Sequence, residues 1–190
     1  YRSWSKYDKA IEGQQQALAI AKKLGKEEDI ASFLIGIAST YYSWGKYDKA
    51  VENFQQALAI NRKLGTKHLI AWSHKLIGDT YCQLLKYDKA IENYRDALAI
   101  NRKLGREDMV ASSLEDLGNV YLDLDQSDKA MENYRDALAI NRKLGIEDGE
   151  YVLNDDRISL SLLKVGGVYE YKSQYDKAME IYREALAIVR

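Results

Sequence analysis

The sequence predicts an all-α fold with no strand, a solenoid built from antiparallel helix pairs. Two observations predict this class. The 190-residue chain has no proline, which would break helix interiors, and it is rich in good helix formers such as Ala, Leu, Lys and Glu. In addition, one short motif returns about every 40 residues. A fixed period of this length is typical of stacked helical units, none of which can bury its apolar face alone.

The repeating motif is Tyr-Asp-Lys-Ala, with one Ser-Asp-Lys-Ala variant. Its copies begin at residues 7, 47, 87, 127 and 175, so the steps are 40, 40, 40 and 48 residues. A Leu-Gly pair recurs in phase and ends at Gly25, Gly65, Gly105 and Gly145. We therefore expect one solenoid over 1–190, and a piece of a longer array. Its predicted parts are a truncated first repeat (1–25) and repeats at 26–65, 66–105, 106–145 and 146–190, the last with an eight-residue insertion.

Each repeat is predicted to contain two helices. The second helix should begin at the Asp of the motif, because the carboxylates of Asp48 and Asp88 would accept free backbone amides there as N-caps. Gly65 follows the same helix at a natural C-cap position. The first helix, for example 109–123, carries apolar residues at helical spacing. At the start of the chain, 1–4 align with the end of a first helix, so a second helix is expected over 8–24.

These residues resemble the tetratricopeptide repeat family over essentially the whole chain. The first-helix signature Leu-Gly-x-x-Tyr is present at 117–121, and as Ile-Gly-x-x-Tyr at 77–81. The second-helix signature, Ala, an aromatic residue four positions on and Ala three further on, is present in 90–97 and 130–137. The 40-residue period and the missing proline are similar to the long-repeat branch that includes polarity adaptors and bacterial regulators. Ala38 replaces the usual first-helix glycine.

The resemblance implies a right-handed superhelix whose first helices line an inner, concave wall and whose second helices form the outer wall. The second-helix segments 90–105 and 130–145 agree at 15 of 16 positions, whereas the first-helix segments 70–85 and 110–125 agree at only 5 of 16. Variation therefore concentrates where the family's ligands would lie. Drift on a solvated surface is the alternative reading.

The family pattern also implies which residues form the inner wall and contact a partner. They are Ile35, Ser39, Tyr42, Trp72, Lys75, Asp79, Glu115, Asp116, Asn119, Asp123, Leu163, Lys164 and Tyr171. The two lysines against four carboxylates leave a charge of -2, which does not suit the two-carboxylate clamp of chaperone-binding relatives. We therefore expect an apolar or basic partner segment, with Trp72, Ile35 and Tyr42 as apolar anchors and the carboxylates pairing with its Lys or Arg.

Nothing in the sequence predicts catalysis, a cofactor or a metal site. His74 is expected to be a hydrogen-bonded core residue, and Cys82 an inert packing thiol. The acidic segment 147–156 fails the calcium-loop pattern, so we read it as a solvated loop that could form a contact edge. The balanced charge, 28 basic against 29 acidic residues, argues against a nucleic-acid surface, and no apolar run is long enough for a membrane span.

The predicted function is a non-catalytic protein–protein interaction scaffold in the cytoplasm. It would bind a peptide or protein segment in its concave groove, as part of a longer adaptor or regulatory protein. Two alternatives stay open: a structural array that associates end to end with copies of itself, and a sensory arm fused to an enzyme or transcription module outside this segment.

Overall fold

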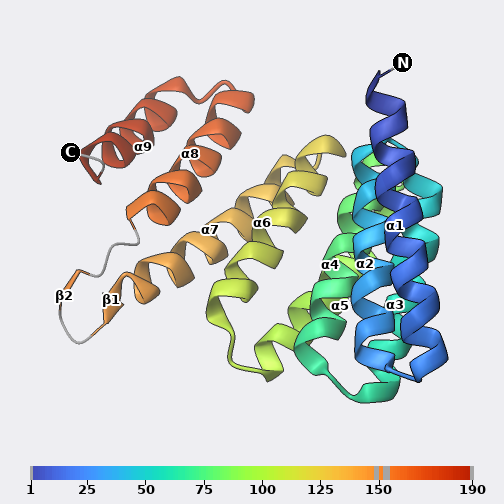
Figure 1. Ribbon diagram of the computed structural model, residues 1–190. Helices are drawn as coiled ribbons and strands as arrows, with labels where there is room; N and C mark the ends of the chain where they lie inside the picture. Colours follow the sequence, from blue (N-terminus) through green and yellow to red (C-terminus); the bar gives the residue numbers. More distant parts are fainter. Residues whose placement is uncertain (1, 148–149, 152–154, 189–190) are drawn as a thin grey trace. The chain divides into compact units, whose positions relative to one another are not determined.

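The structure is a computed structural model that describes residues 2–147, 150–151 and 155–188 (Figure 1). The chain forms two compact units, Tyr1–Ile100 and Asn101–Arg190. The first unit contains α1 (Arg2–Leu24), α2 (Glu27–Ser43), α3 (Tyr47–Leu64), α4 (Lys67–Gln83) and most of α5 (Tyr87–Lys103). The second contains α6 (Glu107–Asp123), α7 (Ser127–Leu144), α8 (Asp155–Tyr171) and α9 (Tyr175–Ile188). The predicted all-α class is confirmed.

A short strand pair departs from the prediction that the chain contains no strand. β1 (Ile146–Glu147) and β2 (Glu150–Tyr151) pair antiparallel inside the eight-residue insertion. The insertion also changes the end of α7. Gly25, Gly65 and Gly105 close their helices at positive φ, as expected for a C-cap glycine, whereas Gly145 has a φ of -78° and leads directly into β1.

The helix starts also differ from the sequence expectation. We predicted Asp48 as an N-cap, but α3 begins one residue earlier, and Lys46 is the N-cap residue without a side-chain capping bond. The carbonyl of Lys46 accepts the first helical bond, from the amide of Ala50, at 3.1 Å. Asp48 lies within the first turn, where its charge still favours the positive end of the helix dipole. The start predicted for α1 was also wrong, because one continuous helix runs from Arg2, not from Asp8.

The Lys of the repeated motif has a role that the sequence analysis missed. In every two-helix repeat its ammonium group lies over the ring of a first-helix tyrosine, a cation–π contact. The distances from nitrogen to ring centre are 5.4 Å for Lys49 and Tyr41, 5.5 Å for Lys89 and Tyr81, 5.3 Å for Lys129 and Tyr121, and 5.6 Å for Lys177 and Tyr169. This contact joins the two helices of each repeat, and it explains why Lys recurs in the motif.

A second repeated contact sets how closely the two helices of a repeat approach. Gly78 of α4 lies under the ring of Tyr94 of α5, so closely that a Cβ on the glycine would lie 2.7 Å from a ring carbon. The same distance is 2.5 Å for Gly118 and Tyr134. In these two repeats the signature glycine is favoured because the aromatic ring occupies the space of a side chain.

Candidate functional site

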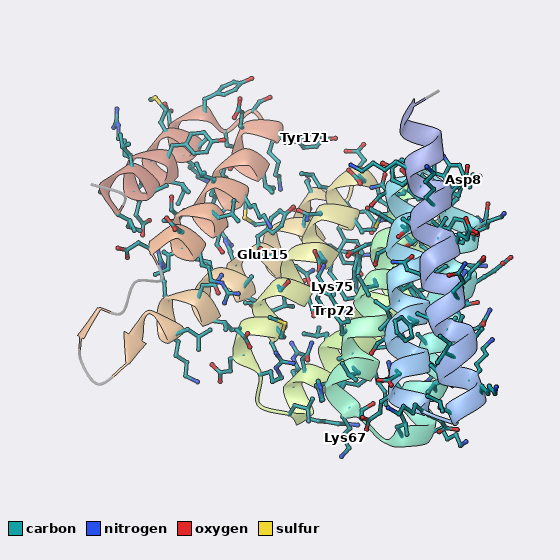
Figure 2. The ribbon with its side chains drawn as sticks, viewed as in Figure 1. Asp8, Lys67, Trp72, Lys75, Glu115 and Tyr171 are labelled. Atoms are coloured by element: carbon teal, nitrogen blue, oxygen red, sulfur yellow. The ribbon has the colours of Figure 1, made fainter. Side chains whose placement is uncertain are left out.

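In the first unit, α4 carries three of the predicted inner-wall residues on one face. Trp72, Lys75 and Asp79 follow at helical spacing, and the Trp72 side chain is 45% exposed (Figure 2). The ammonium of Lys75 lies 3.2 Å from Oδ1 of Asp79. The same oxygen accepts a hydrogen bond from the hydroxyl of Tyr94 at 2.7 Å. Trp72 is thus an exposed aromatic side chain beside an ion pair that is already formed.

The α2 residues contribute less exposed surface to this inner wall. Ile35 is partly buried and packs against a core cluster around Leu34 and Ile37. Ser39 is exposed. Tyr42 is half-buried, and burial and then the negative charge of Asp79 raise the pKa of its hydroxyl. Tyr42 from α2 therefore lies within the electrostatic influence of Asp79 from α4.

In the second unit, Glu115 of α6 is bound to α8. Its Oε2 lies 2.7 Å from Nζ of Lys164, and its Oε1 accepts a hydrogen bond from Ser161 at 2.9 Å. Asn141 of α7 donates to the same serine hydroxyl at 2.9 Å. The Glu115 and Lys164 side chains are only 16% and 22% exposed. This network ties three helices of the unit together.

The other α6 residues surround a buried tyrosine. The hydroxyl of Tyr134 donates to Oδ1 of Asn119 at 2.7 Å. Burial, with the negative charges of Asp123, Glu115 and Asp116, raises the pKa of Tyr134 to about 12. Asp123 and Asn119 are exposed, and Asp116 is partly buried. Burial and the nearby carboxylates therefore both favour the protonated form of the Tyr134 hydroxyl.

The inner wall of α8 is more apolar than the sequence analysis recognised. Leu163 and Tyr171 are 47% and 55% exposed, and Leu160, which we did not predict, is 49% exposed. Leu160 occupies the position of Trp72 in its own repeat, and this equivalence could have identified it. The hydroxyl of Tyr171 donates to Oδ1 of Asp125, which holds the tyrosine at the end of α8.

The structure changes the interpretation of the inner-wall charges. We counted Asp79 and Glu115 as carboxylates for a partner's Lys or Arg, with Lys75 and Lys164 as the opposing charges. Each carboxylate instead pairs with one of these lysines inside the chain. The sequence could not show the Glu115–Lys164 pair, whose residues lie 49 positions apart, whereas the Lys75–Asp79 pair has the i, i+4 spacing typical of ion pairs on a helix. The more exposed groups on these faces are Trp72 in one unit and the α8 residues in the other.

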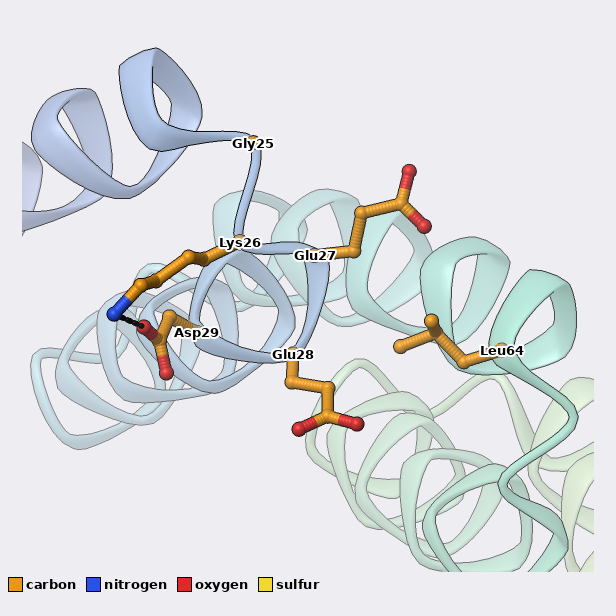
Figure 3. A pocket seen from close by; sticks show the side chains of 6 residues that line it. All are labelled: Gly25, Lys26, Glu27, Glu28, Asp29 and Leu64. Carbon is orange, nitrogen blue, oxygen red and sulfur yellow. Dashed lines mark ion pairs between the residues drawn. The ribbon is translucent and has the colours of Figure 1, made fainter.

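Two hollows lie elsewhere on the surface. One, of about 540 Å³, is lined by the α1–α2 turn, the acidic first turn of α2 and Leu64 (Figure 3). Its Lys26 and Asp29 form a 3.8 Å ion pair, and Glu27 pairs with Lys63. The other, of about 350 Å³, lies in the second unit between Arg142, Ile158 and Ile188. Within the described residues, no cluster of three or more His, Cys, Asp or Glu is arranged to hold a metal ion.

His74 and Cys82 lie where the sequence analysis placed them, in packed surroundings. His74 is buried, with Nδ1 at 2.9 Å from Oδ1 of Asn93 and Nε2 at 3.1 Å from a guanidinium nitrogen of Arg62. It is a hydrogen-bonded core histidine, as predicted. The thiol of Cys82 lies 3.5 Å from the Tyr94 hydroxyl. No helix among the described ranges combines the length and apolar character needed to cross a bilayer.

Comparison with known proteins identifies the family. Tetratricopeptide repeat models match residues 5–63, 29–103, 69–143 and 161–190. A search of curated proteins gave no match. Among solved structures, BtubC (BKLC) from P. vanneervenii is 26% identical, with a TM-score of 0.83, and the alignment covers 98% of this chain and 74% of that chain.

Two further similar structures show the fold and are about twice as long as this chain. Aspartyl phosphate phosphatase F from Bacillus subtilis is 16% identical with a TM-score of 0.82, and 98% of this chain covers 48% of it. A Rap protein complexed with Competence and Sporulation Factor is 20% identical with a TM-score of 0.74. That alignment covers 98% of this chain and 50% of the Rap chain. Because the family models match most of its length, this chain belongs to the tetratricopeptide repeat family.

Proposed function

We propose that this chain is a non-catalytic scaffold that binds a peptide or protein segment along the inner walls of its first helices. The observation that carries the proposal is the contrast between first and second helices. The second-helix segments 90–105 and 130–145 agree at 15 of 16 positions, whereas the first-helix segments 70–85 and 110–125 agree at only 5 of 16. The first helices also expose large apolar residues, Trp72 on α4 and Leu163 and Tyr171 on α8. Exposed aromatic and aliphatic anchors on an otherwise polar surface are typical of binding sites.

Two further points support the proposal. The family consists of repeat arrays with extended binding surfaces, and a similar Rap protein was solved with Competence and Sporulation Factor bound. The paired inner-wall charges favour an apolar segment over one held mainly by ion pairs. A cytoplasmic location and a place within a longer adaptor or regulatory protein belong to the same proposal, and they stay predictions.

An unbiased peptide selection tests the proposal. Random peptides displayed on phage are selected on the whole chain and then measured on two variants, one with inner-wall changes (Trp72→Ala, Leu163→Gln) and one with outer-wall changes (Glu92→Ala, Glu132→Ala). Selected peptides should lose about tenfold or more in affinity on the inner-wall variant and keep it on the outer-wall variant. Equal affinity for the two variants, both folded by circular dichroism, would show that the inner walls are not the binding surface.

A specific observation also favours the alternative of self-association. α9 exposes Met179 and Leu186, which are 49% and 54% exposed, whereas the equivalent Met131 and Leu138 of α7, where α8 packs, are each 7% exposed. At the other end of the chain, Ile20 and Leu24 of α1 are exposed as well. Because these two faces differ, contact between copies would be head to tail.

Light scattering over a concentration series tests self-association. The average mass should rise with concentration, and the change Met179→Gln with Leu186→Gln should return it to the monomer value. A constant monomer mass for the unchanged chain at every concentration would eliminate this alternative.

A further inference from the structure

The inner wall of α8 carries a continuous apolar stripe. Leu160, Leu163, Gly167 and Tyr171 follow at steps of three, four and four residues, which places them within about 80° of one another on a helix that turns about 100° per residue. The three large side chains are about half exposed. We call these four residues the α8 stripe. It extends over three helical turns.

Gly167 makes a gap in the middle of the α8 stripe. A Cβ placed on it would have only the Tyr182 hydroxyl oxygen as a near neighbour, at 4.0 Å. The space between Leu163 and Tyr171 is therefore open to a side chain from outside. A small residue between two large ones also lets another helix approach closely.

Tyr171, at one end of the α8 stripe, is held in place before a partner binds. The Tyr171 hydroxyl is bonded to Asp125 of the α6–α7 turn, and the neighbouring Lys164 is held by Glu115. An anchor fixed in this way loses less conformational entropy on binding. Because Lys164 is already paired, the side of the stripe next to it does not require a partner carboxylate.

The exposed carboxylate of Asp123 indicates which charge a partner should carry near one end of the α8 stripe. Asp123 of α6 is exposed and occupies the position in its repeat that Tyr171 occupies in the next. Asp123 adds to the negative charge that acts on Tyr134. A basic group at the end of a partner helix would therefore be favoured at the Tyr171 end of the stripe.

From these observations we infer that the α8 stripe binds the apolar face of an amphipathic helix from another protein. One large apolar side chain of that helix lies over Gly167, two flanking apolar residues contact Leu160, Leu163 and Tyr171, and a Lys or Arg near one end reaches Asp123. This inference rests on the proposed scaffold function and names the partner chemistry of one of its inner walls.

Fluorescence anisotropy with synthetic peptides tests the inference. The probe is a labelled Ala- and Gln-based peptide of about 16 residues, long enough for a helix, with Leu at positions i, i+4 and i+7 and Lys at both ends. Three companion peptides replace the leucines by Gln, replace the terminal lysines by Glu, or place a proline in the middle.

The stripe variant carries Leu160→Gln, Leu163→Gln and Tyr171→Gln, and a second variant carries Gly167→Asn, the residue that α6 has at the equivalent position. The matched control is Met179→Gln with Leu186→Gln, which removes equally exposed apolar residues from α9.

The Leu and Lys probe should bind the unchanged chain and the α9 control equally, and lose about tenfold or more in affinity on the stripe and Gly167→Asn variants. The Glu-ended peptide should bind more weakly, by a margin that shrinks as salt is added. Absence of binding, unchanged affinity on the stripe variant, loss on the α9 control, or full binding by the proline peptide would each overturn the inference.

The two proposals fail in different ways. Peptides from the unbiased selection that depend on Trp72 but bind the stripe variant normally would leave the scaffold function intact and eliminate the α8 stripe as its site. Selected peptides that ignore every inner-wall change would eliminate the scaffold function itself.

Discussion

The two faces of α8 carry glycine at consecutive positions and use it in opposite ways. On the face toward α9, Gly166 lies under the ring of Tyr182, and a Cβ there would lie 2.4 Å from a ring carbon. On the inner wall, Gly167 has open space above it. The first face is closed around Leu162, which is fully buried, whereas the second leaves Leu163 and Tyr171 half exposed.

The two glycine positions of α8 also differ in how often glycine recurs at the equivalent positions of other repeats. The contact of Gly166 recurs as Gly78 with Tyr94 and as Gly118 with Tyr134, so it belongs to the packing of three helix pairs, whereas α2 carries Ala38 at the glycine position. The position of Gly167 is Asp79 in α4 and Asn119 in α6, which shows that the fold does not require glycine there. Positions that stay the same build the solenoid, and positions that vary are available for recognition.

The largest expected effect is from Gly166→Ala. Alanine is the better helix former by about 1 kcal/mol, but its methyl group would overlap the Tyr182 ring, and overpacking costs typically about 1 to 3 kcal/mol. We expect a net loss of up to about 2 kcal/mol in the free energy of unfolding, measured by urea denaturation. Gly118→Ala should behave similarly. A stability equal to that of the unchanged chain would mean that Tyr182 moves aside at little cost.

A second effect concerns the ion pair on the inner wall of the second unit. Lys164→Met removes the cation from Glu115, which is 16% exposed and keeps its hydrogen bond from Ser161. We expect a loss of roughly 1 to 2 kcal/mol, less than for a fully buried pair, since water still reaches both groups. A double-mutant cycle with Glu115→Gln measures the coupling directly. A coupling near zero would show that the pair does not hold α6 to α8.

Tyr134 links the core face to the inner wall, and its contribution should depend on pH. Tyr134→Phe removes the hydrogen bond to Asn119 and should cost about 1 kcal/mol near neutral pH. The folded state raises the pKa of this tyrosine from 10.0 to about 12. The unfolded chain therefore ionises first, so this stability is complete below pH 10 and is lost as the pH rises toward 12.

Urea denaturation of both proteins between pH 7 and 12 checks this dependence. The stability difference between the unchanged chain and Tyr134→Phe should shrink above pH 10. A difference that stays constant through this range would show that burial does not keep the Tyr134 hydroxyl protonated.

Much of the fold could be predicted from the sequence because the repeat displays it several times. A contact such as Gly118 with Tyr134 leaves a pattern that recurs with the period, and the family signature records it. The start of α3 was placed one residue late, because a first-turn Asp and an N-cap Asp look alike in sequence. The strand pair in the insertion lies in a segment that occurs once, so no second copy indicated its structure.

The candidate site was harder to predict, because ion pairs within the chain decide which polar side chains can still contact a partner protein. Glu115 and Lys164 were correctly placed on first helices, but their mutual contact depends on how α6 packs beside α8. Leu160 was overlooked because an isolated leucine in a helix is usually a core residue. Only its exposure shows that it continues the row of Leu163 and Tyr171.

The smallest effect on stability is expected from Gly167→Ala, and it separates the two faces of α8 most sharply. The added methyl group meets no atom closer than 4.0 Å, so the higher helix propensity of alanine should raise the free energy of unfolding by about 0.5 to 1 kcal/mol. This change in stability has the opposite sign to that expected for the neighbouring Gly166→Ala.

The same methyl group would occupy part of the gap between Leu163 and Tyr171. Affinity for the Leu and Lys probe should therefore fall while stability rises, because a site kept open for a partner sacrifices some stability of the free protein. Urea denaturation and fluorescence anisotropy on the same sample measure both quantities. A rise in stability with unchanged affinity would mean that the partner helix does not approach α8 closely at Gly167.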